Sequence, residues 1–275
     1  MLSVQRLSMV LGKLHASQPS GTKLIDYATA LNAAWQQKSQ PFLIVNNGAD
    51  TTATVIFSHG LGDTGNGWAQ GFEYEVAPQL RHIRFVFPTA RSIPVTLNGG
   101  MRMPAWYDIP SLDRNRLLME AEGITDSAAL IQSIAVVEAD RLAKHGASKR
   151  VVIGGFSQGA ALSLLSAHTF PDRLAGVAAL SGYLTAQAEL KAKWEQANSD
   201  APLFMAHGQY DPVVPYESGS KSYDLLVDLK KGRLTAADAG TGRDWSFNTY
   251  PMEHTSSPAE MQDLVAFLRR VVPRL

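Results

Sequence analysis

The 275-residue sequence contains no cysteine. This absence excludes disulfides, thiolate metal sites, a cysteine nucleophile and S-palmitoylation of the protein itself. No charge of either sign is in excess, because 25 Lys and Arg residues balance 25 Asp and Glu residues. The chain therefore has no global field that would attract nucleic acid or an acidic membrane. No apolar run approaches the roughly 20 residues of a membrane span. This size and composition predict a globular protein with a sizeable core.

The first 25 residues contain no acidic side chain, although basic residues and serines are present. Apolar side chains between Leu7 and Leu14 fall on one face of a helix. Such a segment resembles an organellar transit peptide. The alternative is an N-terminal helix docked on the domain, followed by a second helix around Leu24 to Trp35. We expect the docked segment, because no removal site is evident.

The rest of the chain alternates between segments typical of strands and segments typical of helices. This order predicts one α/β domain with a mostly parallel sheet that helices cover on both faces. Residues 89–111, rich in Pro, Gly and Met, predict an irregular connection. The expected strands are 41–45, 54–58, 83–87, 151–153, 175–180, 202–206 and 246–250, and the expected helices are 66–80, 122–144, 160–167 and 261–272.

A serine between two glycines lies where an apolar strand meets a helix. The segment Gly155-Phe156-Ser157-Gln158-Gly159 has the G-x-S-x-G pattern. Between a strand and a helix, this pattern predicts a nucleophile elbow, a sharp turn that exposes the serine hydroxyl. The helix that follows should carry a single apolar stripe and should point its N-terminus at the site, which favours developing negative charge. The alternative is a flexible turn with no catalytic role.

A nucleophilic serine needs a histidine base and an acid that orients the base. In proteins with this elbow the acid and then the histidine follow the serine along the chain. Only His168, His207 and His254 follow Ser157. His168 lies on the helix after the elbow, where we expect capping or packing, and His207 precedes the strand-end residue Asp211. If Asp211 is the acid, His254 is the one remaining base. Taken singly, the last two residues could also be an ordinary turn aspartate and loop histidine.

The tetrahedral intermediate of such a reaction needs two hydrogen-bond donors. The backbone N–H of Gln158, directly after the serine, supplies one. The loop His59-Gly60-Leu61-Gly62-Asp63 follows an earlier strand, and its glycines allow the N–H of Leu61 to face the oxyanion. We expect His59 to hold this loop rather than to react.

Five segments together resemble the acyl-protein thioesterase/lysophospholipase family and its bacterial carboxylesterase relatives. They are VIFSHGLGDTGNGW, PVTLNGGMRMPAWYDI, GGFSQGAALSL, HGQYDPVVP and MEHTSS, and they span the chain from about Val55 to the C-terminus. The resemblance implies an α/β-hydrolase fold, the triad Ser157, Asp211 and His254, the oxyanion donors Leu61 and Gln158, and no cofactor or metal.

The resemblance also implies a domain division and a substrate channel. Residues 1–40 would form an N-terminal helical extension and residues 41–275 the α/β-hydrolase domain. Four side chains near the irregular stretch 94–109 would line an apolar acyl channel, although that stretch could instead only cap the core; they are Leu61, Met101, Met103 and Trp106. The chain departs from the family in its longer N-terminus, in an expanded segment at 230–244, and in lacking the N-terminal cysteine on which family members are often lipidated.

The expected function is a serine hydrolase that cleaves long-chain acyl thioesters, including protein depalmitoylation, and related carboxyl esters and lysophospholipids. The substrates would be S-acylated proteins or acyl-ester lipids, with transient contact at a membrane surface and no nucleic-acid partner. The expected location is cytoplasmic, with organellar targeting by residues 1–25 as the alternative. Two further alternatives are a short-chain carboxylesterase and a non-catalytic binding protein on a hydrolase scaffold.

Overall fold

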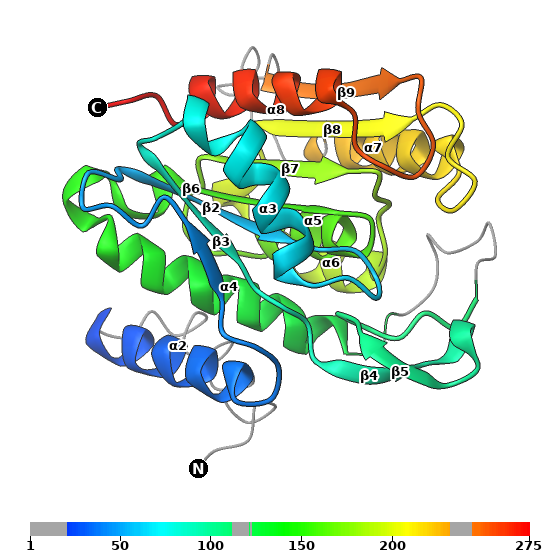
Figure 1. Ribbon diagram of the computed structural model, residues 1–275, viewed down its shortest axis with the longest axis horizontal. Coiled ribbons are helices and arrows are strands. Elements are labelled where there is room, and N and C mark those ends of the chain that lie inside the picture. Colours follow the sequence, from blue (N-terminus) through cyan, green and yellow to red (C-terminus); the bar gives the residue numbers. More distant parts are fainter. Residues whose placement is uncertain (1–20, 112–120, 122, 232–243) are drawn as a thin grey trace.

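A seven-stranded sheet forms the centre of the computed structural model, which describes residues 21–111, 121, 123–231 and 244–275 (Figure 1). The strand order is β1-β3-β2-β6-β7-β8-β9, and all neighbouring pairs are parallel except the antiparallel pair of β1 and β3. Every residue of β2, β7 and β8 is buried, as expected of strands covered on both faces. The strands are β1 Leu43–Val45, β2 Ala53–Ser58, β3 Ile83–Phe87, β6 Val151–Phe156, β7 Gly176–Leu180, β8 Leu203–Gly208 and β9 Trp245–Tyr250.

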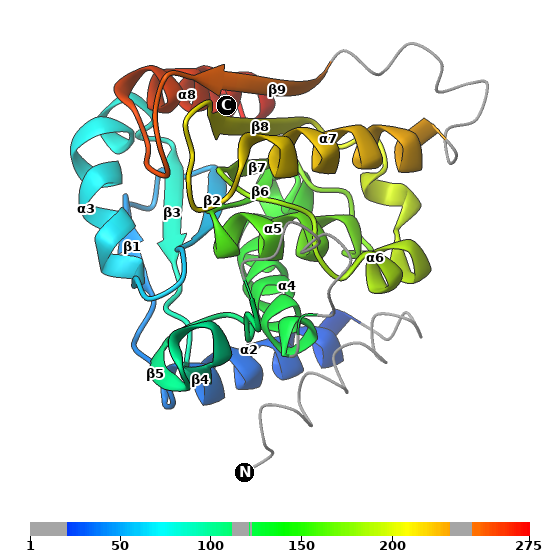
Figure 2. The ribbon, with the colours of Figure 1, turned by 90° about the vertical axis from the view of Figure 1, so that its right-hand side faces the viewer.

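Helices cover the sheet on both faces (Figures 1 and 2). Helices α3 (Gly65–Glu75) and α8 (Pro258–Val271) pack on one face around a cluster that includes Phe72 and Leu264. The second cluster of buried apolar residues lies under the helices of the other face, with α2 packed on the outside of α4. Those helices are α2 Gly21–Gln36, α4 Ile124–Arg141, α5 Gln158–His168, α6 Gln187–Lys193 and α7 Tyr216–Lys231.

The predicted α/β architecture with a mostly parallel sheet is confirmed, while two local expectations were wrong and two helices were not predicted. The stretch 89–111 contains a hairpin of β4 (Ser92–Val95) and β5 (Met101–Pro104). Helices α6 and α7 were not predicted. Helix α5 has no single apolar stripe, because all of its residues are buried between the sheet and neighbouring helices.

The N-terminal part of the chain contributes to the core. In α2, the side chains of Ala28, Leu31 and Trp35 are buried, and the indole N–H of Trp35 donates to the carbonyl of Thr89 at 3.0 Å. The described part of the proposed extension is therefore a docked helix. Residues 1–20, with the apolar face at Leu7 to Leu14 and most of the proposed targeting segment, and residues 232–243 of the expanded segment lie outside the described residues.

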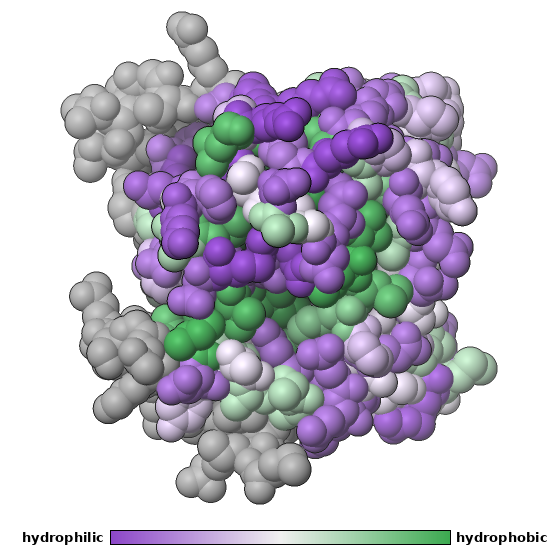
Figure 3. Space-filling view, turned by 60° about the vertical axis from the view of Figure 1, so that its left-hand side comes forward, coloured by the Kyte–Doolittle hydropathy of each residue, from purple (hydrophilic) through white to green (hydrophobic). Residues whose placement is uncertain are grey.

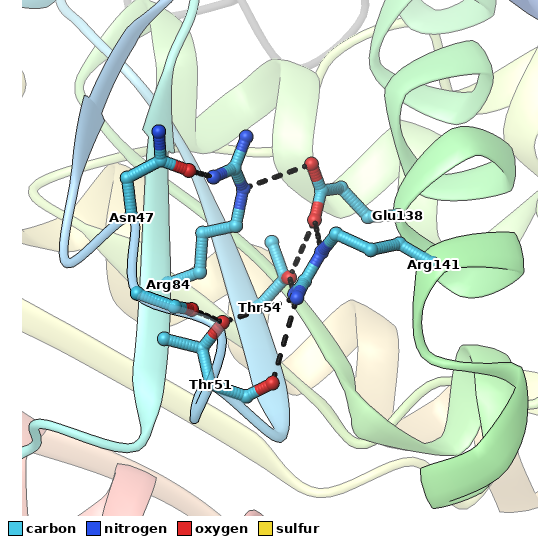
Figure 4. Close-up of polar contacts among 7 residues, drawn as sticks. Asn47, Thr51, Thr54, Arg84, Glu138 and Arg141 are labelled. Atoms are coloured by element: carbon cyan, nitrogen blue, oxygen red, sulfur yellow. Dashed lines mark hydrogen bonds and ion pairs between the residues drawn. The ribbon is translucent and has the colours of Figure 1, made fainter.

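A buried carboxylate ties α4 to the sheet at the end where β2 begins (Figure 4). Glu138 accepts hydrogen bonds from Arg84 Nε at 3.2 Å, Arg141 Nε at 2.8 Å and Thr54 Oγ1 at 2.8 Å. Arg141 also donates to Thr51 Oγ1 at 3.0 Å. Because both oxygens of Glu138 are paired with cations or a hydroxyl, the charge is compensated where it is buried.

The edge strand β1 leaves apolar surface accessible. Ile44 is 37% exposed and its two neighbours in the strand are half-buried. Figure 3 shows apolar side chains gathered in a hollow at mid-height on the face that it displays, between more polar regions above and below. A cavity of about 620 Å³ lies between β1 and α3. Among the residues that the structure describes, no helix is long and apolar enough to cross a membrane.

Candidate active site

Ser157 occupies a strained turn between β6 and α5. Its backbone has a φ of 54° and a ψ of −117°, an uncommon conformation for a residue with a side chain. The elbow requires glycine at position 159, because a Cβ there would lie 2.1 Å from the carbonyl oxygen of Ser58. The chain passes from strand to helix so sharply because this small residue lets α5 approach β2.

The structure brings Ser157 together with the other two residues of the proposed triad. Its Oγ lies 2.9 Å from His254 Nε2, and His254 Nδ1 lies 2.7 Å from Asp211 Oδ2. Each residue follows the carboxyl end of a different parallel strand, Ser157 after β6, Asp211 after β8 and His254 after β9. Three strands far apart in sequence therefore bring a hydroxyl, an imidazole and a carboxylate to one edge of the sheet.

Hydrogen bonds between the chains of β8 and β9 continue past the end of β8 and position Asp211 and His254. Gln209 N–H donates to the carbonyl of Tyr250 at 2.9 Å, and Tyr210 N–H donates to that of Met252 at 3.1 Å. The loop that carries Asp211 is thereby hydrogen-bonded to the chain just before His254. This continuation explains how two loops present their side chains at hydrogen-bond distance.

Asp211 is held as an anion. Its Oδ1 accepts hydrogen bonds from the backbone N–H groups of Val213 at 2.9 Å and Val214 at 2.8 Å. Burial by itself would raise the pKa of Asp211, but the hydrogen bonds from His254, Val214 and Val213 outweigh it and hold the pKa below its ordinary value. A carboxylate in this position keeps the imidazole in the tautomer that leaves Nε2 able to accept the serine proton.

The other two downstream histidines have packing roles. His168 is buried in α5, its ring stacks on Trp194 with 4.3 Å between centroids, and burial lowers its pKa to about 4. His207 is buried as well, and its Nε2 donates to the carbonyl of Val214 at 2.8 Å. Burial lowers the pKa of His207, so its ring stays neutral behind the acid loop.

The backbone N–H groups of Leu61 and Gln158 have no hydrogen-bond acceptor in the part of the chain that the structure describes. Gln158 is the first residue of α5, where helix geometry leaves the N–H unpaired. His59 fixes the loop that carries Leu61: its Nδ1 donates to the carbonyl of Gly60 at 2.7 Å, and its Nε2 accepts from Ala90 N–H at 3.0 Å. Gln158 adjoins Ser157 in the chain and Leu61 lines the same cavity as Ser157, so both expected donors lie in the backbone around the serine.

Trp106 does not have the position expected of a channel residue. It is 1% exposed, and its indole N–H donates to the carbonyl of His59 at 2.8 Å. Its backbone N–H donates to Gln158 Oε1 at 3.0 Å, while Gln158 Nε2 donates to the carbonyl of Tyr107 at 2.7 Å. These bonds draw Trp106 inward. Trp106 therefore stabilises the loop of Leu61, through the carbonyl of His59, and the elbow, through the side chain of Gln158. This buried position corrects the expectation that Trp106 lines a channel.

A cavity of about 460 Å³ opens at Ser157 and His254. Of the four expected channel residues, only Leu61 lines it. Met101 is 64% exposed on the β4–β5 hairpin, and the Sδ of Met103 lies near Gly62; their role in binding an acyl chain remains a prediction. The cavity instead extends along α3 beside Trp68, which sequence analysis did not single out.

No three His, Asp or Glu side chains come together as a metal site in the described ranges. The site consists of a hydroxyl, an imidazole, a carboxylate and backbone donors. Such a set supports covalent acyl transfer through the serine itself.

The sheet order, the elbow and the positions of the three side chains place the protein among the α/β hydrolases. Residues 40–272 match the model of the Phospholipase/Carboxylesterase family, and the chain belongs to this family. Acyl-protein thioesterase 1 of Mycosarcoma maydis is 42% identical over 240 residues, which are 84% of this chain and 97% of that protein. Acyl-protein thioesterase 1 of Saccharomyces cerevisiae is 36% identical over 79% of this chain and 92% of its own. Among solved structures, Zea mays acyl-protein thioesterase 2 is 29% identical with a TM-score of 0.64, covering 84% of this chain and 98% of that one.

Proposed function

We propose that the protein is a serine hydrolase that removes long acyl chains from protein cysteines, with related carboxyl esters as further substrates. The observation that carries the proposal is the hydrogen-bonded series Ser157–His254–Asp211, with distances of 2.9 and 2.7 Å, at the strained elbow. The relatives named acyl-protein thioesterase support the choice of S-acylated proteins as the substrate class.

The geometry supports a two-step acyl transfer. Ser157 Oγ attacks the thioester carbonyl carbon while His254 Nε2 takes its proton. The N–H groups of Leu61 and Gln158 bind the resulting oxyanion. The C–S bond then breaks as His254 gives the proton to the departing sulfur, which leaves an acyl-Ser157 ester. Water, deprotonated by His254, cleaves this ester and releases the fatty acid and free Ser157.

A short-chain carboxylesterase is the second candidate, because the matched family is described as Phospholipase/Carboxylesterase. The two candidates differ in the dependence of kcat/KM on acyl length. Each buried CH₂ contributes about 0.8 kcal/mol, so a bound long chain should raise kcat/KM several-fold per added pair of carbons. A cytoplasmic location and transient contact with membranes belong to the same proposal, because S-acylated substrates are held at membrane surfaces.

The test measures kcat/KM on thioesters from acetyl to palmitoyl, below micelle-forming concentrations, and on an S-palmitoylated peptide. We expect rates that rise with chain length, cleavage of the peptide, and loss of about six decades of kcat in Ser157→Ala. A preference for acetyl esters with no cleavage of the peptide would favour the carboxylesterase. Hydrolysis retained by Ser157→Ala, with contaminating esterases excluded, would refute the catalytic assignment.

A further inference from the structure

The cavity at Ser157 extends on the side of His254. The ring of Phe156 lies 4.8 Å from that of His254 and 5.1 Å from that of Trp68, measured between centroids, so three rings form a continuous wall. Beyond this wall, Gly71 of α3 lines the cavity, and a Cβ added to Gly71 would meet no atom within 4 Å. The cavity is therefore an aromatic trough that runs from the imidazole along one face of α3.

The position of this trough determines which part of a substrate it can hold. His254 Nε2 must deliver its proton to the departing atom, so the leaving group has to lie within hydrogen-bond reach of that nitrogen. Thr255 and Ser256, which follow His254, also line the trough. The group that departs in the first step, rather than the acyl chain, is thus the part adjacent to this wall.

The carboxylates that line the trough are not balanced by any lysine or arginine among its described lining residues. These carboxylates belong to Asp63 and Glu75. Asp63 Oδ1 accepts a hydrogen bond from Thr64 N–H at 2.7 Å near the start of α3, whereas Glu75 lies exposed at the other end of that helix. Carboxylates attract a cation, and the faces of tryptophan and phenylalanine stabilise one as well.

We propose that this trough is a leaving-group subsite that favours a thiol or alcohol carrying a positive charge, such as a cysteine next to lysine or arginine. The inference rests on the proposed function and adds its substrate selectivity. Glu75 is the specificity-determining residue, because its side chain is exposed to the incoming group, whereas the carboxylate of Asp63 accepts a hydrogen bond from the backbone N–H of Thr64.

A matched pair of thioesters isolates the charge of the leaving group. One is octanoylthiocholine, and the other is the octanoyl thioester of 3,3-dimethylbutanethiol, in which carbon replaces the quaternary nitrogen. The acyl chain is identical, so the ratio of the two kcat/KM values reports only on the leaving group. Since the charge also changes thiol acidity, the informative quantity is the change of this ratio between wild type and variants.

We expect Glu75→Gln to lower the ratio about two- to fivefold and Glu75→Lys to lower it further, as befits one partly screened carboxylate. Glu73→Gln is the control, because Glu73 lies on the same helix but lines the other cavity, between β1 and α3. Added salt should lower the ratio in wild type by screening Glu75, and it should lower the ratio less in Glu75→Gln, which lacks this charge.

The outcomes separate the two proposals. Equal ratios in wild type, Glu75→Gln and Glu75→Lys would overturn the cationic subsite while leaving the hydrolase in place. An equal decrease in Glu73→Gln would also overturn it, since the effect would then arise from net charge alone. Failure of the wild type to cleave either thioester would overturn the proposed function and this inference together.

Discussion

Replacing Glu260 by glutamine should stabilise the protein at alkaline pH. Glu260 lies in the first turn of α8, where its backbone N–H donates to the Oγ of Ser257 at 3.2 Å. Its side chain is buried, and neither carboxyl oxygen has a hydrogen-bond partner among the described residues. Burial therefore raises the pKa of Glu260 to about 8, from an ordinary value near 4.5. The folded protein keeps this carboxyl protonated where the unfolded chain ionises it.

The raised pKa gives a defined dependence of stability on pH. Below the pKa of the unfolded state the carboxyl is neutral in both states, so it makes no contribution to the pH dependence of the free energy of unfolding. As the pH rises toward the folded pKa of about 8, the unfolded state alone loses the proton and the free energy of unfolding decreases. With about 1.4 kcal/mol for each unit of pKa difference, the loss between about pH 5 and about pH 8 is on the order of 3 kcal/mol. Glutamine stays neutral at every pH, so the Glu260→Gln variant should not show this loss of stability.

The assay is urea unfolding of wild type and Glu260→Gln at several pH values across that range. The difference between the two curves isolates Glu260, because all other titrating groups are shared. Glu253→Gln provides a control, since Glu253 is exposed and lies a few residues earlier. If wild type and Glu260→Gln lose stability in parallel as the pH rises, the buried carboxyl is not protonated in the folded state and the reasoning is wrong.

Three further changes test the support around the serine. Gln158→Ala removes the hydrogen bonds that its amide makes with the N–H of Trp106 and the carbonyl of Tyr107, and it should cost roughly 1–3 kcal/mol in urea unfolding; a cost below about 0.5 kcal/mol would contradict the bridge. Gly159→Ala should fail to yield folded protein, because its Cβ would meet backbone at 2.1 Å, and a soluble, active variant would refute that packing. Asp211→Asn should keep the circular dichroism of the wild type yet lose about four decades of kcat, and a near-normal rate would exclude Asp211 as the orienting acid.

The proposed triad could be predicted because its signals are local and ordered. The strand before Ser157, the glycines around it and the chain order of acid and base are all visible in the sequence, and each residue follows a strand whose carboxyl end lies at the same edge. The sheet was predictable for a similar reason: strands buried on both faces appear as short apolar runs.

The features that were missed depend on tertiary contacts or on weak local signals. Trp106 and Met101 are both large apolar residues of one loop region, but only the indole N–H of Trp106 can reach the carbonyl of His59, and that bond decides which is buried. Helix α3 was expected, yet nothing in its sequence shows which face lines the site. The first two turns of helix α7 contain a glycine and three serines, which lower helix propensity. The strands β4 and β5 each contain proline, which is typical of irregular chain.

Reaction with a fluorophosphonate probe tests the central claim most directly, because such a probe is attacked only by an activated hydroxyl. Wild-type protein should gain one phosphonyl group, located by peptide mass spectrometry on Ser157, and should lose hydrolytic activity in proportion to labelling. Ser157→Ala should gain none. Labelling of another residue with loss of activity, or an active wild type that the probe never modifies, would contradict the account of Ser157 as the nucleophile.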